Sequence, residues 1–130
     1  MRRARLLAFF LDWLLCAGLA DIAALAVTGV LWKWFPGWWP VIPWIWGAAA
    51  AAAVGAFLLR DATGGRARRW LALEAVDSDG RPPGVWGSVR RNLPLLVPGW
   101  NLVEIWPVFR RGDARRPSDR RTGIRIVAET

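Results

Sequence analysis

The sequence contains no histidine, no tyrosine and a single cysteine among its 130 residues. Without histidine, the chain lacks the usual general base of enzymes and the commonest protein ligand of metal ions. The lone Cys16 excludes an intrachain disulfide and a thiolate metal cluster. No phosphate-binding loop, Ser/His/Asp set or Cys/His metal spacing is present. We therefore expect no catalytic residue, no metal site and no cofactor, and predict that the chain is not an enzyme.

Apolar and basic residues dominate the composition. The sequence is 55% hydrophobic, contains 11 tryptophans and has a formal net charge of +8. A soluble protein this apolar would not also be this basic, so the composition predicts an integral membrane protein. The arginines flank apolar segments, which favours contact with anionic lipid headgroups and excludes nucleic acid from the expected partners.

The first apolar run covers residues 6–31 and is interrupted only by Asp12, Asp21 and Thr28. It exceeds the roughly 20 residues that a spanning helix needs, which predicts a tilted or projecting transmembrane helix over residues 1–31. The alternative is a cleaved signal peptide, which Asp12 and the apolar continuation beyond it argue against.

Arg5 and Asp12 share one face of this helix, because positions seven apart are separated by about two helical turns. A carboxyl group in hydrocarbon costs about 2.5–3.5 kcal/mol and normally faces a partner or a watery cavity. We expect either a structural ion pair of Asp12 with Arg5 or Arg91, or a proton or cation site at Asp12.

Residues 32–40 are rich in tryptophan and proline. Proline prevents a continuous helix, and indole rings favour the headgroup boundary of a bilayer. We predict an outer membrane-surface connector, with an aromatic recognition surface as the alternative. The expected interface anchors in and beside it are Trp32, Trp34, Trp38, Trp39, Trp44 and Trp46.

Residues 41–60 form the second apolar run and predict a second transmembrane helix. Small residues recur at intervals of four in both runs, which allows helix backbones to approach closely. The two helices are expected to pack as an antiparallel hairpin, although the same residues would also suit a contact between molecules. The expected packing residues are Ala20, Ala24, Gly47, Ala51 and Gly55.

The two arginine-rich segments, residues 61–91 and 110–130, each contain a strand-like stretch. Residues 70–77 alternate between apolar and polar positions, and Asp77-Ser-Asp-Gly80 is a turn signal. Residues 123–128 are also β-rich, so we predict a small cytoplasmic sheet formed by the two stretches.

The distribution of basic residues predicts the topology. Of the 18 Lys and Arg residues, all but Lys33 lie in residues 2–5, 60–91 and 110–125. The positive-inside rule places these parts, and both ends of the chain, in the cytoplasm. Residues 92–109 are apolar but proline-broken and too short to cross twice, so they are expected to be re-entrant or interfacial. A third full span with an outside C-terminus is the alternative.

Charged residues in these segments have several interpretations. Glu104 is expected to coordinate a cation, to cap a half-helix or to be exposed to solvent or lipid headgroups, and Asp119 to be a clamp residue, a loop residue or a helix cap. The arginines near the predicted membrane surface are expected to bind anionic lipid. They are Arg66, Arg68, Arg69, Arg110, Arg111, Arg115 and Arg116.

Four elements in order resemble the RDD family of small membrane proteins. They are Arg5-x-x-Ala8-x-x-x-Asp12, the block 67–80 with its Asp-x-Asp-Gly turn, Arg91-Asn92, and the closing block 119–127 that supplies a second aspartate. The sequence departs from the family pattern at Ala67 and Ile124, where glycine and threonine are usual. The resemblance implies a cytoplasmic-membrane protein of mostly unknown function, and some members have been proposed to be sodium/proton antiporters.

The expected fold is a single α-helical membrane domain with a two-helix hairpin, a re-entrant or interfacial third apolar segment and a small β element. The expected function is that of a non-catalytic structural or accessory subunit that binds lipid and other membrane subunits or copies of itself. Arg5, Asp12, Arg91 and Asp119 are expected to form its charge clamp. The alternatives are an oligomeric ion transporter that uses Asp12, and a lipid-binding module.

Overall fold

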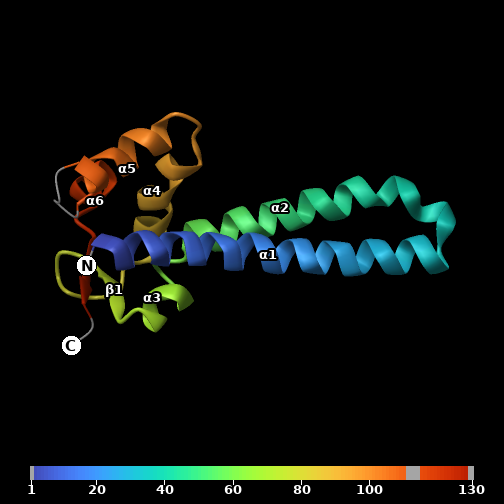
Figure 1. Ribbon diagram of the computed structural model, residues 1–130, viewed down its shortest axis with the longest axis horizontal. Coiled ribbons are helices and arrows are strands. Elements are labelled where there is room, and N and C mark those ends of the chain that lie inside the picture. Colours follow the sequence, from blue (N-terminus) through green and yellow to red (C-terminus); the bar gives the residue numbers. More distant parts are fainter. Residues whose placement is uncertain (1, 111–114, 129–130) are drawn as a thin grey trace. The chain divides into compact units, whose positions relative to one another are not determined.

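The computed structural model describes residues 2–110 and 115–128. The chain is mostly helical, with one small sheet (Figure 1). It divides into two compact units, which we call the hairpin unit (Trp13–Phe57) and the arginine unit (Met1–Asp12 with Leu58–Thr130). In chain order the elements are α1 Arg2–Trp34, η1 Pro36–Val41, α2 Ile42–Leu59, α3 Arg66–Trp70, β1 Leu73–Val76, α4 Val85–Leu96, α5 Trp100–Arg110, α6 Pro117–Thr122 and β2 Arg125–Ala128.

The hairpin unit consists of two long apolar helices joined by the 3₁₀ helix η1 (Figure 1). Proline at the start of η1 and inside it interrupts the regular helix. The predicted pair of long helices is confirmed, and both are long and apolar enough to span a membrane. Their contact includes the Trp13 and Phe57 rings, which meet edge to face with centroids 5.7 Å apart. Such geometry suits the ring quadrupoles.

Little of the hairpin unit is buried. Only 6% of the apolar window of α1 and 11% of that of the following helical segment are buried. The buried residues of this unit are Ala24, Ala53 and Phe57. An apolar surface of this extent is typical of a protein that contacts lipid or another protein.

The arginine unit has a small apolar core between the start of α1 and the sheet. Ala8, on the first turns of α1, packs with Leu73 and Ala75 of β1 and with Ile124 and Ile126. The predicted sheet is confirmed: β1 and β2 are antiparallel, with Ala75 opposite Ile126. The alternation of residues along β1 buries Leu73 and Ala75 and exposes Glu74.

The first strand is shorter than the sequence pattern predicted. Residues 70–77 alternate, but Trp70 ends the short helix α3, and Ala72 has a positive φ of 51° before β1 begins. The turn after β1 follows the sequence signal closely. Asp77 Oδ1 accepts hydrogen bonds from the Asp79 and Arg81 amides at 2.9 and 3.0 Å, and Gly80 has a φ of +78°. This carboxylate closes a turn in the usual way for aspartate.

Residues 92–109 are divided between two helices. Their first part belongs to α4, which begins at Val85, and their last part forms α5. The chain reverses between the two helices, where Gly99 has a φ of +81° that favours glycine. Helices α4, α5 and α6 all contact one another (Figure 1).

Candidate functional site: a buried arginine–aspartate network

Helix α4 presents a polar face to the end of α2. Ser88, Arg91 and Asn92 share this face because positions three and four apart are neighbours on a helix. Ser88 Oγ donates to the Leu58 carbonyl at 2.6 Å, and Asn92 Nδ2 donates to the same carbonyl at 3.3 Å. The last carbonyls of a helix lack intrahelical donors, so these two side chains cap α2.

Asp61 is the centre of the network, and only 1% of its surface is exposed. Its Oδ2 accepts hydrogen bonds from Arg91 Nη1 and Asn92 Nδ2, both at 2.8 Å. Its Oδ1 forms an ion pair with Arg68, and its amide donates to Ser88 Oγ at 3.1 Å. Asp61 therefore joins the end of α2 to α3 and α4.

Asp119 extends the network to α6. Its Oδ1 accepts a hydrogen bond from Arg91 Nε at 2.7 Å and lies 3.4 Å from Arg116 Nε. Its Oδ2 accepts a hydrogen bond from the Arg116 amide at 3.1 Å. One guanidinium, that of Arg91, thus bridges two carboxylates from different parts of the chain, which its planar fork of donors favours.

The network keeps its carboxyl groups ionised. Burial alone would raise the pKa of Asp61, but the positive charges of Arg91 and Arg68 outweigh burial and hold that pKa well below its usual range. The same balance of burial against Arg91 and Arg116 lowers the pKa of Asp119. Burial also opposes the charge of Arg91, but Asp61 and Asp119 outweigh it and raise its pKa.

The other buried arginines of the network differ from Arg91, because their pKa values are lowered. Burial, followed by the charge of Arg68, lowers the pKa of Arg60 well below its usual range. Burial, followed by the charge of Arg91, lowers the pKa of Arg116 to about 10. Burial also lowers the pKa of Arg68, although Asp61 opposes this effect. Positive charge is therefore crowded here.

Asp12 and Arg5 lie at the edge of this network. Asp12 is 3% exposed, and its Oδ2 lies 3.9 Å from Arg68 Nε. Arg68 was not among the partners that we expected for Asp12. A Cβ at Gly65 would lie 3.2 Å from the same oxygen, so the carboxyl approaches the backbone closely there. Arg5 donates to the Ile126 carbonyl and so ties α1 to β2.

Glu104 has a local structural contact. Its side chain is fully buried, and Oε2 accepts a hydrogen bond from the Ser118 amide at 3.0 Å. This amide lies in the first turn of α6, so Glu104 caps that helix, one of the roles expected for it. The expected exposure of Glu104 to solvent or headgroups is wrong, because the side chain is buried between α5 and α6. Among the described residues, no group of three or more His, Cys, Asp or Glu side chains is arranged to hold a metal ion.

The expected lipid-binding arginines divide into two groups. Arg69, Arg110 and Arg115 are exposed, whereas Arg68 and Arg116 are buried in the network at 6% and 9% exposure. Burial removes Arg68 and Arg116 from the set that can face lipid. Arg111 and the side chain of Arg66 lie outside the described residues.

The expected packing residues do not form one interface between α1 and α2. Ala24 is buried and Ala20 is half-buried, but Gly47 and Ala51 are exposed and Gly55 is half-buried. A Cβ added at Gly47 or Gly55 would have no neighbour within 4 Å. Ala53 and Phe57 are buried instead. Each follows an expected packing residue, Ala51 or Gly55, by two positions, which is roughly 200° around a helix. The buried face of α2 is therefore nearly opposite to the expected one.

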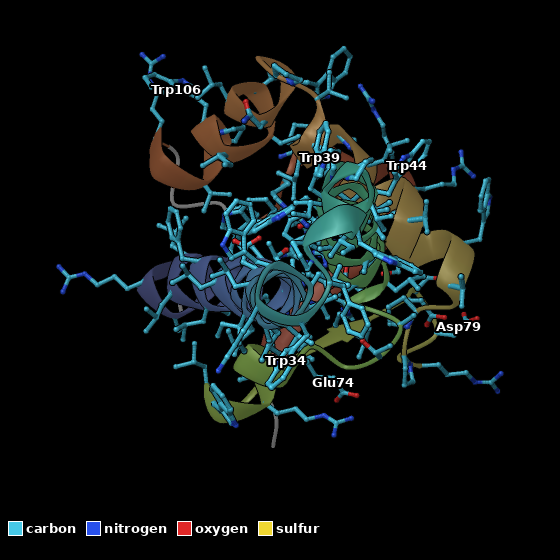
Figure 2. All side chains as sticks on the ribbon, turned by 90° about the vertical axis from the view of Figure 1, so that its right-hand side faces the viewer. Trp34, Trp39, Trp44, Glu74, Asp79 and Trp106 are labelled. Carbon is cyan, nitrogen blue, oxygen red and sulfur yellow. The ribbon has the colours of Figure 1, made fainter. Side chains whose placement is uncertain are left out.

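Most of the expected tryptophan anchors are exposed at the η1 end of the hairpin unit. Figure 2 labels Trp34, Trp39 and Trp44 there, with 68%, 66% and 79% of their surface exposed. Trp32 and Trp38 are also exposed, and Trp46 is half-buried. The Lys33 ammonium lies 5.3 Å from the Trp34 ring centre, a cation–π distance.

Sequence reasoning overlooked Asp61, Arg68, Ser88 and Arg116 as network residues. The Ser88-x-x-Arg91-Asn92 spacing was the available signal, because it puts three polar groups on one face of α4. The acid-base pair Arg60-Asp61, directly after a long apolar helix, was a second signal.

Comparison with known proteins gives a family but no close relative. No curated protein and no solved structure matches the chain. The sequence model described as the RDD family matches residues 2–123, which is nearly the whole chain. The resemblance noted from the four ordered motifs is thereby confirmed. The chain belongs to the RDD family.

Proposed function

We propose that the protein is a non-catalytic membrane protein that serves as a small structural or accessory subunit of a membrane complex. The hairpin unit would lie in the bilayer of the cytoplasmic membrane and contact lipid and a partner. The arginine unit would lie on the cytoplasmic side, with both ends of the chain there. Membership of a family of membrane proteins and two helices of sufficient length and hydropathy support this location.

The observation that carries the proposal is the internal pairing of the buried charges. Arg91 is bonded to Asp61 and Asp119 at 2.8 and 2.7 Å, and both carboxyl groups have lowered pKa values. A carboxylate that stays ionised under all ordinary conditions suits a fixed structural clamp better than a proton relay. The arrangement therefore favours a rigid scaffold.

The surface of α5 supports an interfacial position for part of the predicted third apolar segment. Leu102, Val103 and Trp106 are 70%, 56% and 62% exposed, and Figure 2 labels Trp106 on this helix. Helix α4, in contrast, buries its polar face. Exposed apolar and aromatic side chains on a short helix suit the headgroup region.

Two further groups of residues suit the proposed partners. The exposed Arg69, Arg110 and Arg115 can contact anionic lipid headgroups, each contributing about 1 kcal/mol near the surface. The exposed Gly47 and Ala51 leave room for the backbone of a neighbouring helix from another subunit or from a second copy.

The test is purification of the chain from its own membrane in mild detergent, followed by identification of co-purifying chains. The test variant is Ala51→Leu, which fills the small-residue face of α2. The matched control is Ala56→Leu, because Ala56 is also exposed and lies roughly 140° further around the same helix. We expect a stoichiometric partner or dimer that Ala51→Leu disrupts and Ala56→Leu preserves. A monomer in every preparation would contradict the proposal.

The second candidate is an oligomeric ion transporter, of the sodium/proton type, that uses Asp12. Its supporting observation is a carboxyl group only 3% exposed in a helix that is long and apolar enough to span a membrane. Under this function, reconstituted protein would carry ion-dependent flux in liposomes that Asp12→Asn abolishes. Flux that survives the substitution, or no flux in the parent protein, would exclude it.

A further inference from the structure

The arginine unit contains a cavity of about 80 Å³ that none of the functions above uses. Its volume is enough for several water molecules or a group of similar size. Among the residues that the structure describes, its lining includes the carboxylate of Asp119 and five arginines. They are Arg5, Arg60, Arg68, Arg91 and Arg116.

The other wall of the cavity is apolar. Leu6, Phe9 and Phe10 from the first turns of α1 line it, with Ile105 and Val108 from α5. Phe10 is 55% exposed, so the apolar wall continues to the surface of the unit. The cavity therefore has a cationic part and an apolar wall that reaches the surface. This lining is complementary to an amphiphile with a negatively charged head group.

The network around the cavity carries excess positive charge. Within the described residues, four buried arginines contact or adjoin three aspartates, Asp12, Asp61 and Asp119. Arg5 adds a further positive charge at the cavity, and the buried Glu104 is bonded to the Ser118 amide and does not line it.

Arginine cannot relieve this excess by losing a proton at ordinary pH. Burial and neighbouring arginines lower the pKa values of Arg60 and Arg116, as expected where cations crowd together in a poorly solvated place. A bound anion would offset the repulsion. Guanidinium groups bind phosphate through paired hydrogen bonds, which makes phosphate the anion that these donors fit best.

We propose that this cavity binds the phosphate group of an amphiphile, with the phosphate among the guanidinium groups and the apolar part against Leu6, Phe9 and Phe10. The ligand chemistry is a phosphate ester attached to an acyl or alkyl chain, either a diester with one negative charge or a monoester with up to two. The inference rests on the membrane location in the proposed function but not on the partner subunit. The two can therefore fail independently.

The experiment measures the thermal stability of the full chain in an uncharged detergent with three additives at equal concentration. They are dioctanoyl phosphatidylglycerol, inorganic phosphate and dioctanoylglycerol. Only the first combines phosphate with acyl chains, so we expect it alone to raise the Tm by several degrees, because a ligand of the native state stabilises it. An equal shift with inorganic phosphate or with dioctanoylglycerol would overturn the proposal, as would no shift at all.

Two arginines of the same helix separate the cavity from general attraction to a basic surface. Arg5 lines the cavity, whereas Arg3 is exposed and does not. We expect Arg5→Gln to weaken phosphatidylglycerol binding at least about tenfold and Arg3→Gln to leave it unchanged. Phe10→Ala, which alters only the apolar wall, should also weaken binding and serves if Arg5→Gln does not fold. Undiminished binding in the folded variants of Arg5 and Phe10 would refute the cavity as the site.

Discussion

The two units of this protein differ in the kind of residue that they bury. The hairpin unit is apolar and buries only Ala24, Ala53 and Phe57. Among its described residues, the arginine unit buries four arginines and four acidic residues beside a small apolar core. The first has little to hold it together without an apolar environment, because its surface is left uncovered. The second is held together by buried ion pairs between its helices, such as those of Arg91 with Asp61 and Asp119.

The two units are therefore expected to be destabilised by different kinds of substitution. Losing one apolar side chain from an exposed surface changes little, because no packed cavity is created. Losing one member of a buried ion network leaves its partners charged and unsatisfied, which is among the most damaging single changes. Substitutions in the two units are therefore expected to differ sharply in effect.

The largest effect is expected for Asp61→Ala. It removes the acceptor shared by Arg91, Arg68 and Asn92 and leaves two buried cations without that partner. We expect the free energy of unfolding to fall by about 3–5 kcal/mol, measured by thermal unfolding in mild detergent. The control is Asp79→Ala, because Asp79 lies in the exposed turn after β1, where Figure 2 labels it. Equal stability of the two variants would remove Asp61 from the centre of the network.

The second-largest effect on stability is expected when the pH is lowered. The pKa values of Asp61 and Asp119 are lowered in the folded chain, so their contribution is fully present above the unfolded value near about 4. As the pH falls below that value, the unfolded chain binds protons first and stability decreases. The expected slope is up to about 1.4 kcal/mol per pH unit for each carboxyl group.

Amide hydrogen exchange can locate this acid effect. Between pH 6 and pH 3, corrected for the intrinsic pH dependence of exchange, α4 should lose protection. The apolar α2 window within the hairpin unit should lose far less. Parallel loss of protection in both helices would show that the charge network does not govern acid stability.

Ser88→Ala should have a smaller effect. It deletes the hydroxyl that donates to the Leu58 carbonyl and accepts from the Asp61 amide. Both backbone groups lie in the buried network, so the expected loss is about 1–3 kcal/mol. Ser78→Ala is the matched control because Ser78 is exposed in the turn. Similar stability of the two variants in thermal unfolding would mean that Ser88 does not cap α2.

The same contrast explains what the sequence could predict. Hydropathy and length give the two long helices, and alternation with a turn signal gives the sheet, because these are local properties. The pairing of Asp61 with Arg91 joins residues 30 positions apart, and no local pattern records it. Trp70 shows the converse: its place in an alternating run favoured a strand, yet the short helix α3 includes it.

The burial of individual arginines could not be predicted from the sequence either. Arg68 and Arg69 are adjacent and chemically identical, but Arg68 is 6% exposed and paired with Asp61, whereas Arg69 is exposed. The local charge pattern is the same for both, so it predicted a lipid contact for each. Only the fold decides which of two neighbouring guanidinium groups meets a buried carboxylate.

The smallest effect on stability is expected for Trp44→Ala in the hairpin unit. The side chain is 79% exposed, so the free energy of unfolding in detergent should change by no more than about 0.5 kcal/mol. In lipid vesicles the outcome should differ, because an indole at the headgroup boundary is within reach of lipid-attached quenchers. Brominated lipids should therefore quench less fluorescence in Trp44→Ala than in the parent. Trp86→Ala is the control, since Trp86 is 70% exposed on α4 of the arginine unit, where no lipid contact is proposed, and its removal should leave the quenched signal intact. Equal loss of quenched signal in both variants would show that both indoles contact lipid. The two units would then differ only in the residues that they bury.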